Sequence, residues 1–348
     1  MKKYISLILS ILICGLVSAQ IEKKDYNIVC IGFYNFENLF DTINDPTNDE
    51  SFLPTGEYLY TSKVYFDKLS KLAEVLQQLG TEHSPDGLAF IGTAEIEHQH
   101  CLEDLVAHPA IASRNYKVIQ YESPDERGID CALLYNPKYF NPILHYPIFV
   151  DLSQPDDTSH NTTRDILYIK GTLMQEEVHV LVNHWPSRRG GEEATAALRD
   201  KAAGICKKLI DSLLAVDPDS KVFLMGDFND DPVSNSIKNI LNAKSKINEV
   251  KKGELFNPFF ELYKKGLGTM AYRDAWGLFD QIIISSSITD KNQPGLFFKQ
   301  AIVFNKDFLI TKTGQWKGYP YRTFSGAEYM GGYSDHFATY LVLLKEKK

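Results

Sequence analysis

The sequence predicts an α/β fold in which two sheets pack face to face and helices lie outside them. Apolar runs rich in β-branched and aromatic residues outnumber the helical patterns and do not alternate strictly with them. A single parallel sheet needs regular alternation of strands and helices, so two packed sheets fit better. Hydrophobic residues make up 44% of the chain, which is enough for a sizeable core.

The first residues have the pattern of a secretory signal peptide. Lys2 and Lys3 precede an apolar run over residues 4–17, and Val17-Ser18-Ala19 forms a small-residue cleavage site. A membrane anchor is the alternative, but the run is shorter than the roughly 18–20 apolar residues of a spanning helix. We therefore expect an exported protein, periplasmic or extracellular, without stable membrane insertion after cleavage. Residues 20–348 contain no linker or repeat and are expected to form one domain.

The expected elements follow from local periodicity. Strand patterns occupy residues 27–35, 87–95, 130–135, 165–173, 178–184, 221–229, 280–285 and 337–344. Helical spacing covers residues 69–79, where Gly80 is a stop signal, and residues 194–213. A third helix is expected to begin at Asp231-Pro232. Residues 143–164 predict a surface loop, and residues 243–265 favour a peripheral packing element over a substrate-facing excursion.

Charge and cysteine content narrow the classes of protein. The net charge of -8 argues against broad electrostatic binding to nucleic acid or anionic membrane, although it allows a small basic cleft. Four cysteines follow the leader, namely Cys30, Cys101, Cys131 and Cys206. Their apolar surroundings and the lack of a CxxC pair predict small buried side chains rather than a disulfide framework.

Polar side chains stand at the ends of many of the predicted strands. They are Asn35 and Glu37, Glu95, Asn183 and His184, Asp227 and Asn229, Asp280, and Asp335 and His336. Their burial would be costly unless they converge on a hydrated metal or substrate, and sheet edges are where ligand sites form. Oxygen donors without a cysteine or multi-histidine set suit Mg²⁺, with Mn²⁺ or Ca²⁺ possible, and histidine beside carboxylate suits proton transfer. Together they predict metal-assisted hydrolysis of a phosphoester.

Seven motifs resemble those of the endonuclease/exonuclease/phosphatase superfamily, which has the fold of DNase I, over nearly all of the mature chain. In order they are YNFENLFD (34–41), IGTAEIEH (91–98), SPDERGIDCALLY (123–135), NHWPSRRGG (183–191), MGDFNDDP (225–232), GTMAYRDAWGLFDQIIIS (268–285) and GGYSDHFATYL (331–341). The succession of GDFN, DQI and SDH is the most specific part. The resemblance implies a four-layered α/β sandwich with two mainly antiparallel sheets and helices outside.

The resemblance also implies a role for each polar residue. Glu95 corresponds to the principal metal ligand, Asn35 to the amide beside it, and Asp335 to a second-site carboxylate. His336 is expected to be oriented by Asp280, and either this pair or Asp227 deprotonates the attacking water. Asp227 and Asn229 position water and phosphate, and His184 stabilises the charged phosphorane or assists the leaving oxygen.

Four further residues are candidates for phosphate contacts, because guanidinium and hydroxyl groups match phosphate oxygens. They are Arg127, Arg188, Arg189 and Tyr121. Each has a structural alternative. Arg127 could instead pair with Asp130 or Glu126, and Arg188 and Arg189 could belong to a solvated loop.

The leading functional prediction is a secreted nuclease or other phosphodiesterase, acting as a monomer. The alternatives are a phosphomonoesterase or lipid-headgroup hydrolase, and a non-catalytic binding protein on the same fold. The lack of an obvious exposed aromatic hairpin disfavours a lipid substrate. Glu95, Glu97, His98 and His100 also suggest a separate transition-metal site. Their spacing does not match the HExxH pattern, so this site is not favoured.

Overall fold

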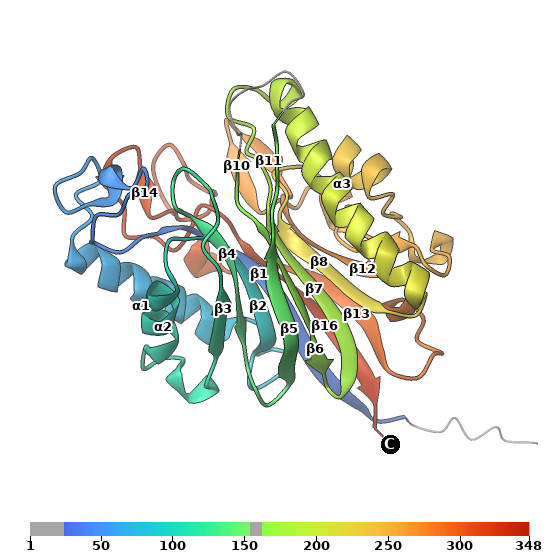
Figure 1. The fold of residues 1–348 in the computed structure, drawn as a ribbon. Helices are drawn as coiled ribbons and strands as arrows, with labels where there is room; N and C mark the ends of the chain where they lie inside the picture. The colour runs from blue at the N-terminus through green and yellow to red at the C-terminus, as the bar shows by residue number, and fades with distance from the viewer. Residues whose placement is uncertain (1–23, 154–161, 348) are drawn as a thin grey trace, which may run out of the picture.

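The computed structural model describes residues 24–153 and 162–347, which fold into two six-stranded sheets packed face to face (Figure 1). The first sheet has the order β13 (Leu296–Phe304), β16 (Ala338–Glu346), β1 (Tyr26–Leu39), β2 (Leu88–Ile96), β4 (Asp130–Tyr135) and β3 (Lys117–Gln120). The second has the order β5 (Phe140–Ile148), β6 (Ile166–Leu173), β7 (Glu176–His184), β8 (Lys221–Asp227), β12 (Asp280–Ser285) and β9 (Leu255–Phe256). The expected signal peptide lies outside the described residues.

Both sheets are mainly antiparallel, with one parallel pair in each. β1 and β2 pair in parallel, as do β7 and β8. Parallel neighbours need a crossover, and a long helix lies within each one: α1 (Ser62–Gln78) between β1 and β2, and α3 (Glu192–Val216) between β7 and β8. The shorter α2 (Gln99–Ala107) follows β2, and α4 (Phe260–Lys264) follows β9.

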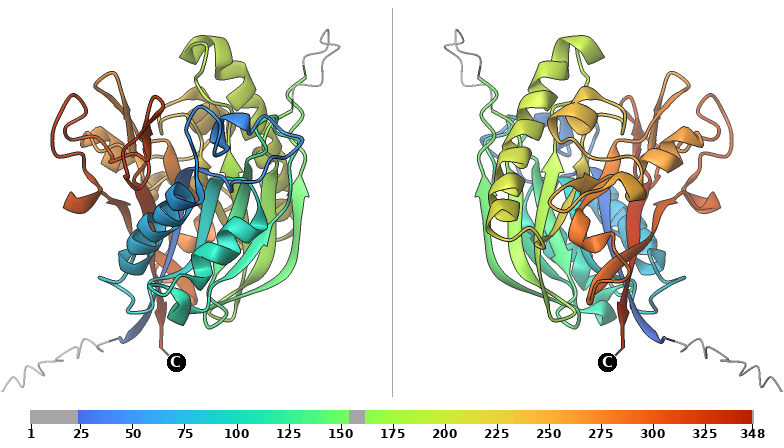
Figure 2. Two further views of the ribbon diagram at one scale, coloured as in Figure 1. Left: turned by 90° about the vertical axis from the view of Figure 1, so that its left-hand side faces the viewer. Right: turned by 90° about the vertical axis from the view of Figure 1, so that its right-hand side faces the viewer.

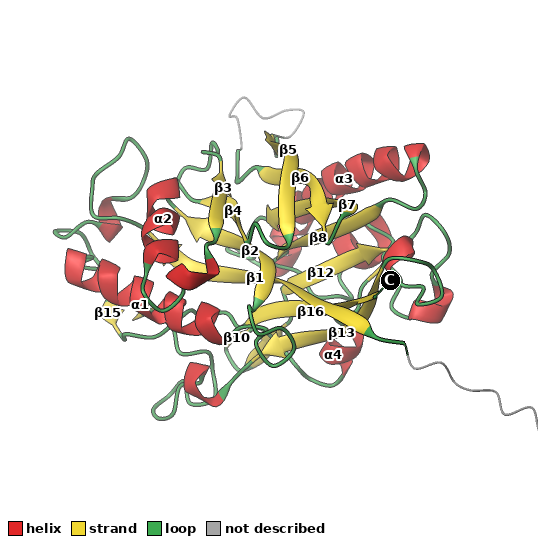
Figure 3. Ribbon diagram, turned by 90° about the horizontal axis from the view of Figure 1, so that it is seen from below, coloured by secondary structure: helices red, strands yellow, loops and turns green. Residues whose placement is uncertain are grey.

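The helices cover the outer faces of the two sheets, which gives four layers. Figure 2 shows α1 and α2 on one side of the sandwich and α3 on the other, and Figure 3 shows the strands between them. One apolar cluster fills the space between the sheets, where the rings of Phe90 and Phe223 lie 6.1 Å apart, and extends under α1 and α2. A second cluster lies between the second sheet and α3. The predicted fold class is therefore confirmed.

Local predictions were correct where the apolar period was strong. Leu69, Leu72 and Leu76 are buried on α1, and Gly80 follows that helix with a φ of +78°, as a helix stop requires. The prediction of a third helix that begins at Asp231-Pro232 was wrong. The segment contains one π-helical turn, Ser236–Ile240. The carboxylate of Asp231 does not cap it, because this group accepts a hydrogen bond from the backbone N–H of Leu278.

The predicted loop over residues 143–164 was also wrong in its first part. β5 continues to Ile148, with Pro142 and Pro147 inside it. Proline is tolerated there because β5 is the edge strand of its sheet. Residues 154–161 of that segment lie outside the described residues. β13 and the short β3 and β9 were not predicted, because each is too brief or too irregular in its alternation.

Two smaller predictions were confirmed. All four cysteines are free and buried, as expected. Leu255, Phe256 and Phe259 are buried, so residues 243–265 pack peripherally, as favoured.

Two small hairpins complete the described chain, β10 (Met270–Tyr272) with β11 (Ala275–Gly277), and β14 (Phe324–Ser325) with β15 (Glu328–Tyr329). The first carries Tyr272, 63% exposed, and Trp276, 38% exposed, so an exposed aromatic hairpin does exist. Across the described residues, no helix has the length and apolar character needed to cross a membrane.

Candidate active site

An irregularity in β2 presents Glu95 to the cleft at the end of the sandwich. The pairing of β2 with β4 shifts register between Ala94 and Ile96, which leaves Glu95 unpaired, and Glu95 has a φ of +64°. A bulge of this kind re-aims a side chain, and a non-glycine residue in the left-handed region costs about 1–3 kcal/mol. The backbone N–H of Asn38 donates to Glu95 Oε2 at 3.0 Å and fixes the carboxylate.

The two sheets meet at a hydrogen bond between Asn35 and Asp227. Asn35 belongs to β1 of the first sheet and Asp227 ends β8 of the second. Asn35 Nδ2 donates to Asp227 Oδ2 at 3.1 Å, and Asn35 Oδ1 accepts from the backbone N–H of Glu37 at 2.9 Å. Both side chains are buried, so polar groups from opposite sheets converge as the sequence predicted.

His336 is held by Asp280 on the strand next to Asp227. Asp280 faces Asp227 across the β8–β12 pair, and its Oδ2 lies 2.7 Å from His336 Nδ1. His336 Nε2 then lies 3.8 Å from Asp227 Oδ2 and 3.9 Å from Asp335 Oδ1. Burial works against a charged imidazole, yet the carboxylates of Asp280 and Asp227 outweigh it and hold the pKa of His336 well above its ordinary value. Burial raises the pKa of Asp227 to about 7.

His184 lies between the two carboxylates that the sheets contribute. Its Nε2 is 3.6 Å from both Glu95 Oε1 and Asp227 Oδ2. Its Nδ1 is buried and, among the described residues, has no hydrogen-bond partner. Burial, followed by the positive charges of Arg164 and Arg127, holds the pKa of His184 well below its ordinary value. His184 is therefore a neutral imidazole beside a carboxylate cluster.

Asn229 is the last polar residue of the converging set. Its φ is +49°, and its backbone N–H donates to Asp227 Oδ1 at 2.9 Å, which closes a tight turn after β8. Its side-chain Nδ2 donates to the backbone oxygen of Trp185 at 3.0 Å. The turn therefore fixes Asp227 and Asn229 relative to each other.

Five of these polar residues line one cleft of about 370 Å³, namely Glu95, His184, Asp227, Asn229 and His336. Arg127, Arg164 and Arg189 line the same cleft, together with Asp125 and Glu126. Arg164 was not predicted. It is 7% exposed, and donates to Asp125 Oδ2 at 3.1 Å and to the backbone oxygen of Trp185 at 2.7 Å. An arginine directly before the strand at 165–173 was the available signal.

Two predicted phosphate contacts are not among the residues that line this cleft. Arg188 Nε donates to the backbone oxygen of Asn229 at 2.8 Å, and the guanidinium pairs with Glu192, Asp230 and Asp231. Arg188 therefore stabilises the turn at Asn229 and does not line the cleft. The Tyr121 hydroxyl lies 2.8 Å from His145 Nδ1, on the adjoining β5 strand.

Asp335 lies at the boundary between His336 of the first cleft and a second cleft. Its Oδ2 accepts from Arg322 at 2.8 Å, and both residues line a space of about 310 Å³ with Tyr272, Trp316 and Tyr319. The rings of Trp276 and Phe337 stack at 6.1 Å with an interplanar angle of 15° close by. Of the three predicted metal ligands, Glu95 lines the first cleft, Asn35 is fully buried and hydrogen-bonded to Asp227, and Asp335 lines the second cleft next to His336.

The residues of the first cleft fit a hard divalent cation. Glu95 and Asp227 supply carboxylate oxygens, and no cysteine is among the described residues that line this cleft. Asp280 adds one further buried carboxylate near Asp227 and His336, an arrangement that a cation stabilises. Such a donor set suits Mg²⁺ or Mn²⁺.

Asp130 does not pair with Arg127, and its pKa predicts an effect on stability. It accepts from the backbone N–H of Ser123 at 2.8 Å and from Gln120 at 3.1 Å, and burial raises its pKa from 3.8 to about 7. A carboxyl with a raised pKa stabilises the fold fully below its unfolded pKa, and this contribution is lost as pH rises through the folded pKa. We expect stability to fall by up to roughly 4 kcal/mol between about pH 4 and pH 7 from this group.

Urea unfolding of wild type and Asp130→Asn at several pH values measures this effect. The wild type is expected to lose stability across that window, and the amide variant is expected to show a smaller loss. Equal pH dependence in the two proteins would exclude Asp130 as the source.

A two-sheet sandwich with carboxylate, amide and imidazole groups gathered at one end defines a DNase I-like fold. The family model described as "Endonuclease/Exonuclease/phosphatase family" matches residues 30–345, and the chain belongs to this family. The family and the site together support a phosphoester hydrolase.

Solved structures of the same fold cover almost the whole chain. An endonuclease/exonuclease/phosphatase family protein from Bacteroides thetaiotaomicron has a TM-score of 0.55 at 15% identity, covering 93% of this chain and 97% of that one. The mannosyl-6-phosphatase Bt3783 of the same organism has a TM-score of 0.54 at 17% identity, covering 90% and 99%. TDP2 of D. rerio, complexed with single strand DNA product, has a TM-score of 0.53 at 14% identity, covering 91% and 98%. No curated protein sequence matches at a significant level.

Proposed function

We propose that this protein is an exported, Mg²⁺-dependent hydrolase of phosphodiesters that uses activated water as its nucleophile. The observation that carries the proposal is the meeting of Glu95, His184, Asp227 and His336 in one cleft that three arginines also line. Carboxylates and imidazoles suit proton transfer and metal binding, and guanidinium groups suit phosphate oxygens. Export is proposed from residues 1–19, which have the composition of a signal peptide.

In the proposed reaction, the arginines and the carboxylates of the cleft have different roles. Arg127, Arg164 and Arg189 hold the phosphate oxygens, and Glu95 with Asn35 would hold the divalent ion. That ion, when bound, would neutralise charge on the phosphoryl group and on the leaving oxygen. The attacking water is placed by Asp227, whose carboxylate is fixed by Asn35 and Asn229.

Proton transfer involves the residues on either side of Asp227. His336 is oriented by Asp280 and presents Nε2 to Asp227. Because its raised pKa keeps the imidazole protonated, Asp227 accepts the water proton and His336 stabilises the charge of that carboxylate. His184, a neutral imidazole near Glu95, is placed to donate a hydrogen bond to a phosphoryl or leaving oxygen. No side chain in this arrangement has to form a covalent intermediate.

The two clefts favour a diester over a monoester. His336 lines the first cleft, and its neighbour Asp335 lines the second, so groups attached to both sides of a phosphorus atom find a place. The aromatic lining of the second cleft, with Trp316 and Tyr319, suits a planar ring such as a nucleobase. A nucleic acid is accordingly the leading substrate class, and the D. rerio TDP2 complex with single strand DNA product has the same fold.

A phosphomonoesterase is the second candidate. Three arginines around one cleft of about 370 Å³ match the higher charge of a terminal phosphate. The mannosyl-6-phosphatase from Bacteroides thetaiotaomicron has the same fold.

A substrate panel distinguishes these candidates. The purified protein lacking residues 1–19 is assayed with Mg²⁺ and with EDTA against single-stranded DNA, a bis-aryl phosphodiester and the matching aryl monoester. Faster turnover of DNA and diester, abolished by EDTA and by Asp227→Asn, supports the proposal. Turnover of the monoester alone supports the second candidate, and no turnover of any substrate favours a binding protein on this fold.

Arg189 is expected to affect substrate binding more than fold stability. It is exposed and lines the cleft, so Arg189→Ala is expected to raise KM about tenfold with little change in Tm. Arg188→Ala is the matched comparison. Because Arg188 is bound to the Asn229 turn and three carboxylates, its loss is expected to lower Tm. An unchanged KM in Arg189→Ala would exclude a phosphate contact for this residue.

A further inference from the structure

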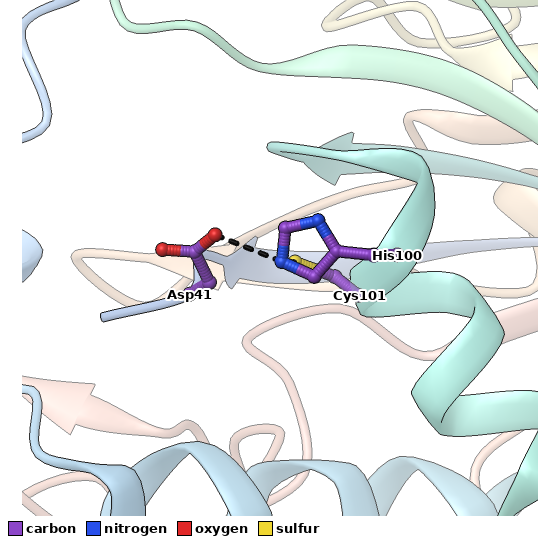
Figure 4. A group of neighbouring side chains, drawn as sticks. All are labelled: Asp41, His100 and Cys101. Atoms are coloured by element: carbon purple, nitrogen blue, oxygen red, sulfur yellow. Dashed lines mark hydrogen bonds and ion pairs between the residues drawn. The ribbon is translucent and has the colours of Figure 1, made fainter. Parts of the chain in front are cut away.

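Three metal-binding side chains meet outside the cleft, where the loop after β1 touches the start of α2. Asp41 follows β1, and His100 and Cys101 lie in the first turn of α2. One donor atom from each lies within 4.8 Å of the other two. Asp41 Oδ2 is 2.8 Å from His100 Nε2, which in turn is 3.8 Å from Cys101 Sγ. Figure 4 shows the three side chains pointing toward one another from these two segments.

We propose that Asp41, His100 and Cys101 bind a zinc-class divalent ion. A donor set of one oxygen, one nitrogen and one sulfur suits Zn²⁺, whereas Mg²⁺ and Ca²⁺ take oxygen ligands. None of the three residues lines the catalytic cleft, so this ion is distinct from the one that Glu95 would hold. Three protein ligands leave a fourth tetrahedral position for water.

The spacing of the donors matches a tetrahedral ion. Zinc bonds of ~2.0–2.3 Å place neighbouring donor atoms roughly 3.3–3.8 Å apart. The separation of His100 Nε2 and Cys101 Sγ, 3.8 Å, lies at the upper end of this range. Asp41 and His100 form an ion pair at 2.8 Å and need only separate slightly to admit the ion.

Charge and access also suit this ion. One carboxylate and one thiolate balance its two positive charges, so the complex is neutral although Asp41 and Cys101 are buried. The thiol proton of Cys101 leaves to solvent as the sulfur binds. The His100 side chain is 47% exposed and provides the route of entry.

Neighbouring groups hold the donors in place, as the surroundings of a metal site must. The backbone N–H of Asp41 donates to Glu97 Oε2 at 2.6 Å, and the backbone N–H of Glu97 donates to the oxygen of Leu39 at 3.0 Å. The fully buried Tyr60 hydroxyl has no hydrogen-bond partner among the described residues. Burial, followed by the negative charges of Cys101 and Glu97, raises the pKa of Tyr60, so this hydroxyl lies close to the donor set.

The structure therefore changes the membership of the cluster that the sequence suggested. Glu95 belongs to the catalytic cleft, Glu97 and His98 form a second group with Asp41, and Asp41 and Cys101 join His100. Only the tertiary structure brings Asp41 to α2, since 58 residues lie between it and His100.

A bound ion at this position would connect the loop after β1 to α2. The same loop reaches the catalytic cleft, because the backbone N–H of Asn48 donates to the oxygen of Glu126 at 2.9 Å, next to Arg127. The ion would thereby stabilise the wall of the cleft that carries Arg127.

Cobalt substitution tests the site, because Co²⁺ bound to a thiolate gives a charge-transfer absorption that oxygen ligands do not give. The EDTA-treated protein is titrated with Co²⁺, and then with Zn²⁺, in excess Mg²⁺ that keeps the oxygen site filled. We expect one Co²⁺ per chain with a thiolate band, displaced by Zn²⁺. Cys101→Ser is expected to abolish the band, and His100→Ala to weaken binding by about tenfold or more.

Two matched variants separate the site from the rest of the chain. Cys206→Ser keeps a donor to Asn183 Oδ1, and His108→Ala changes the other end of α2, so both should retain the band. Thermal unfolding without metal checks that His100→Ala is folded, as its exposure predicts. A band that survives Cys101→Ser, or no band at all with folded wild type, would overturn the proposal.

Discussion

His336→Ala is expected to lower kcat/KM for the best phosphodiester substrate by about 10²–10⁴-fold, the usual contribution of a positioned acid or base. His336 Nδ1 is bound to Asp280 at 2.7 Å, and its Nε2 faces Asp227 in the cleft. Alanine removes the imidazole without adding a group that could replace it. Steady-state kinetics with Mg²⁺ measure the loss.

The partner of His336 provides a second readout. Asp280→Asn keeps the shape of the side chain but removes the charge that holds the imidazole protonated and oriented, so the pH profile of kcat/KM should change as well as its height. His108→Ala, on the distant end of α2, is the matched control and should retain wild-type activity. Wild-type kinetics in His336→Ala would remove this histidine from the proposed reaction.

Arg199→Ala is expected to destabilise the fold by about 3–5 kcal/mol, the cost of breaking a buried ion pair. Arg199 on α3 is fully buried, and its Nε donates to Asp230 Oδ1 at 2.7 Å. Its other nitrogens donate to the backbone oxygens of Pro186, Ser187 and Glu192 and to Thr195 Oγ1. Removal of the arginine therefore leaves the buried Asp230 carboxylate without its main counter-charge.

Chemical denaturation of Arg199→Ala measures this loss, and Lys207→Ala is the matched control on the same helix. Lys207 pairs with Asp211 at the surface, and such an exposed pair contributes only about 0.3–0.5 kcal/mol. Activity should fall with stability in the arginine variant, because Arg199 connects α3 to the Pro186–Ser187 segment at the cleft. A change in unfolding free energy similar to that of the control would contradict the structural role assigned here.

Residues with a strong local signal were predicted correctly. These signals depend on neighbours in the sequence. They are the apolar spacing of α1 and α3, the apolar runs of β8 and β12, and the polar residues at the ends of these strands. The succession of GDFN, DQI and SDH placed Asp227, Asp280 and His336 in one site before any coordinates, and the structure brings their donor atoms within 4.8 Å.

Elements whose identity depends on distant partners were predicted less well. β5 contains two prolines and is a strand only because β6 supplies its hydrogen bonds. Arg188 and Arg189 are adjacent and chemically identical, yet one is held by three carboxylates and the other lines the cleft. The sequence gives no means of separating them, because the difference lies in which neighbours the fold supplies.

The sequence by itself determined the class of fold and the polar residues at the ends of its strands, because periodicity and ordered motifs depend only on residues near one another in the chain. Only the tertiary structure decided which polar groups share a site. It placed Asp335 beside Arg322 at a second cleft, brought Arg164 into the first, and joined Asp41 to His100 and Cys101. The physical reason is that donor atoms only a few ångströms apart in space come from segments far apart in the chain, and the packing of the two sheets and their helices sets those distances.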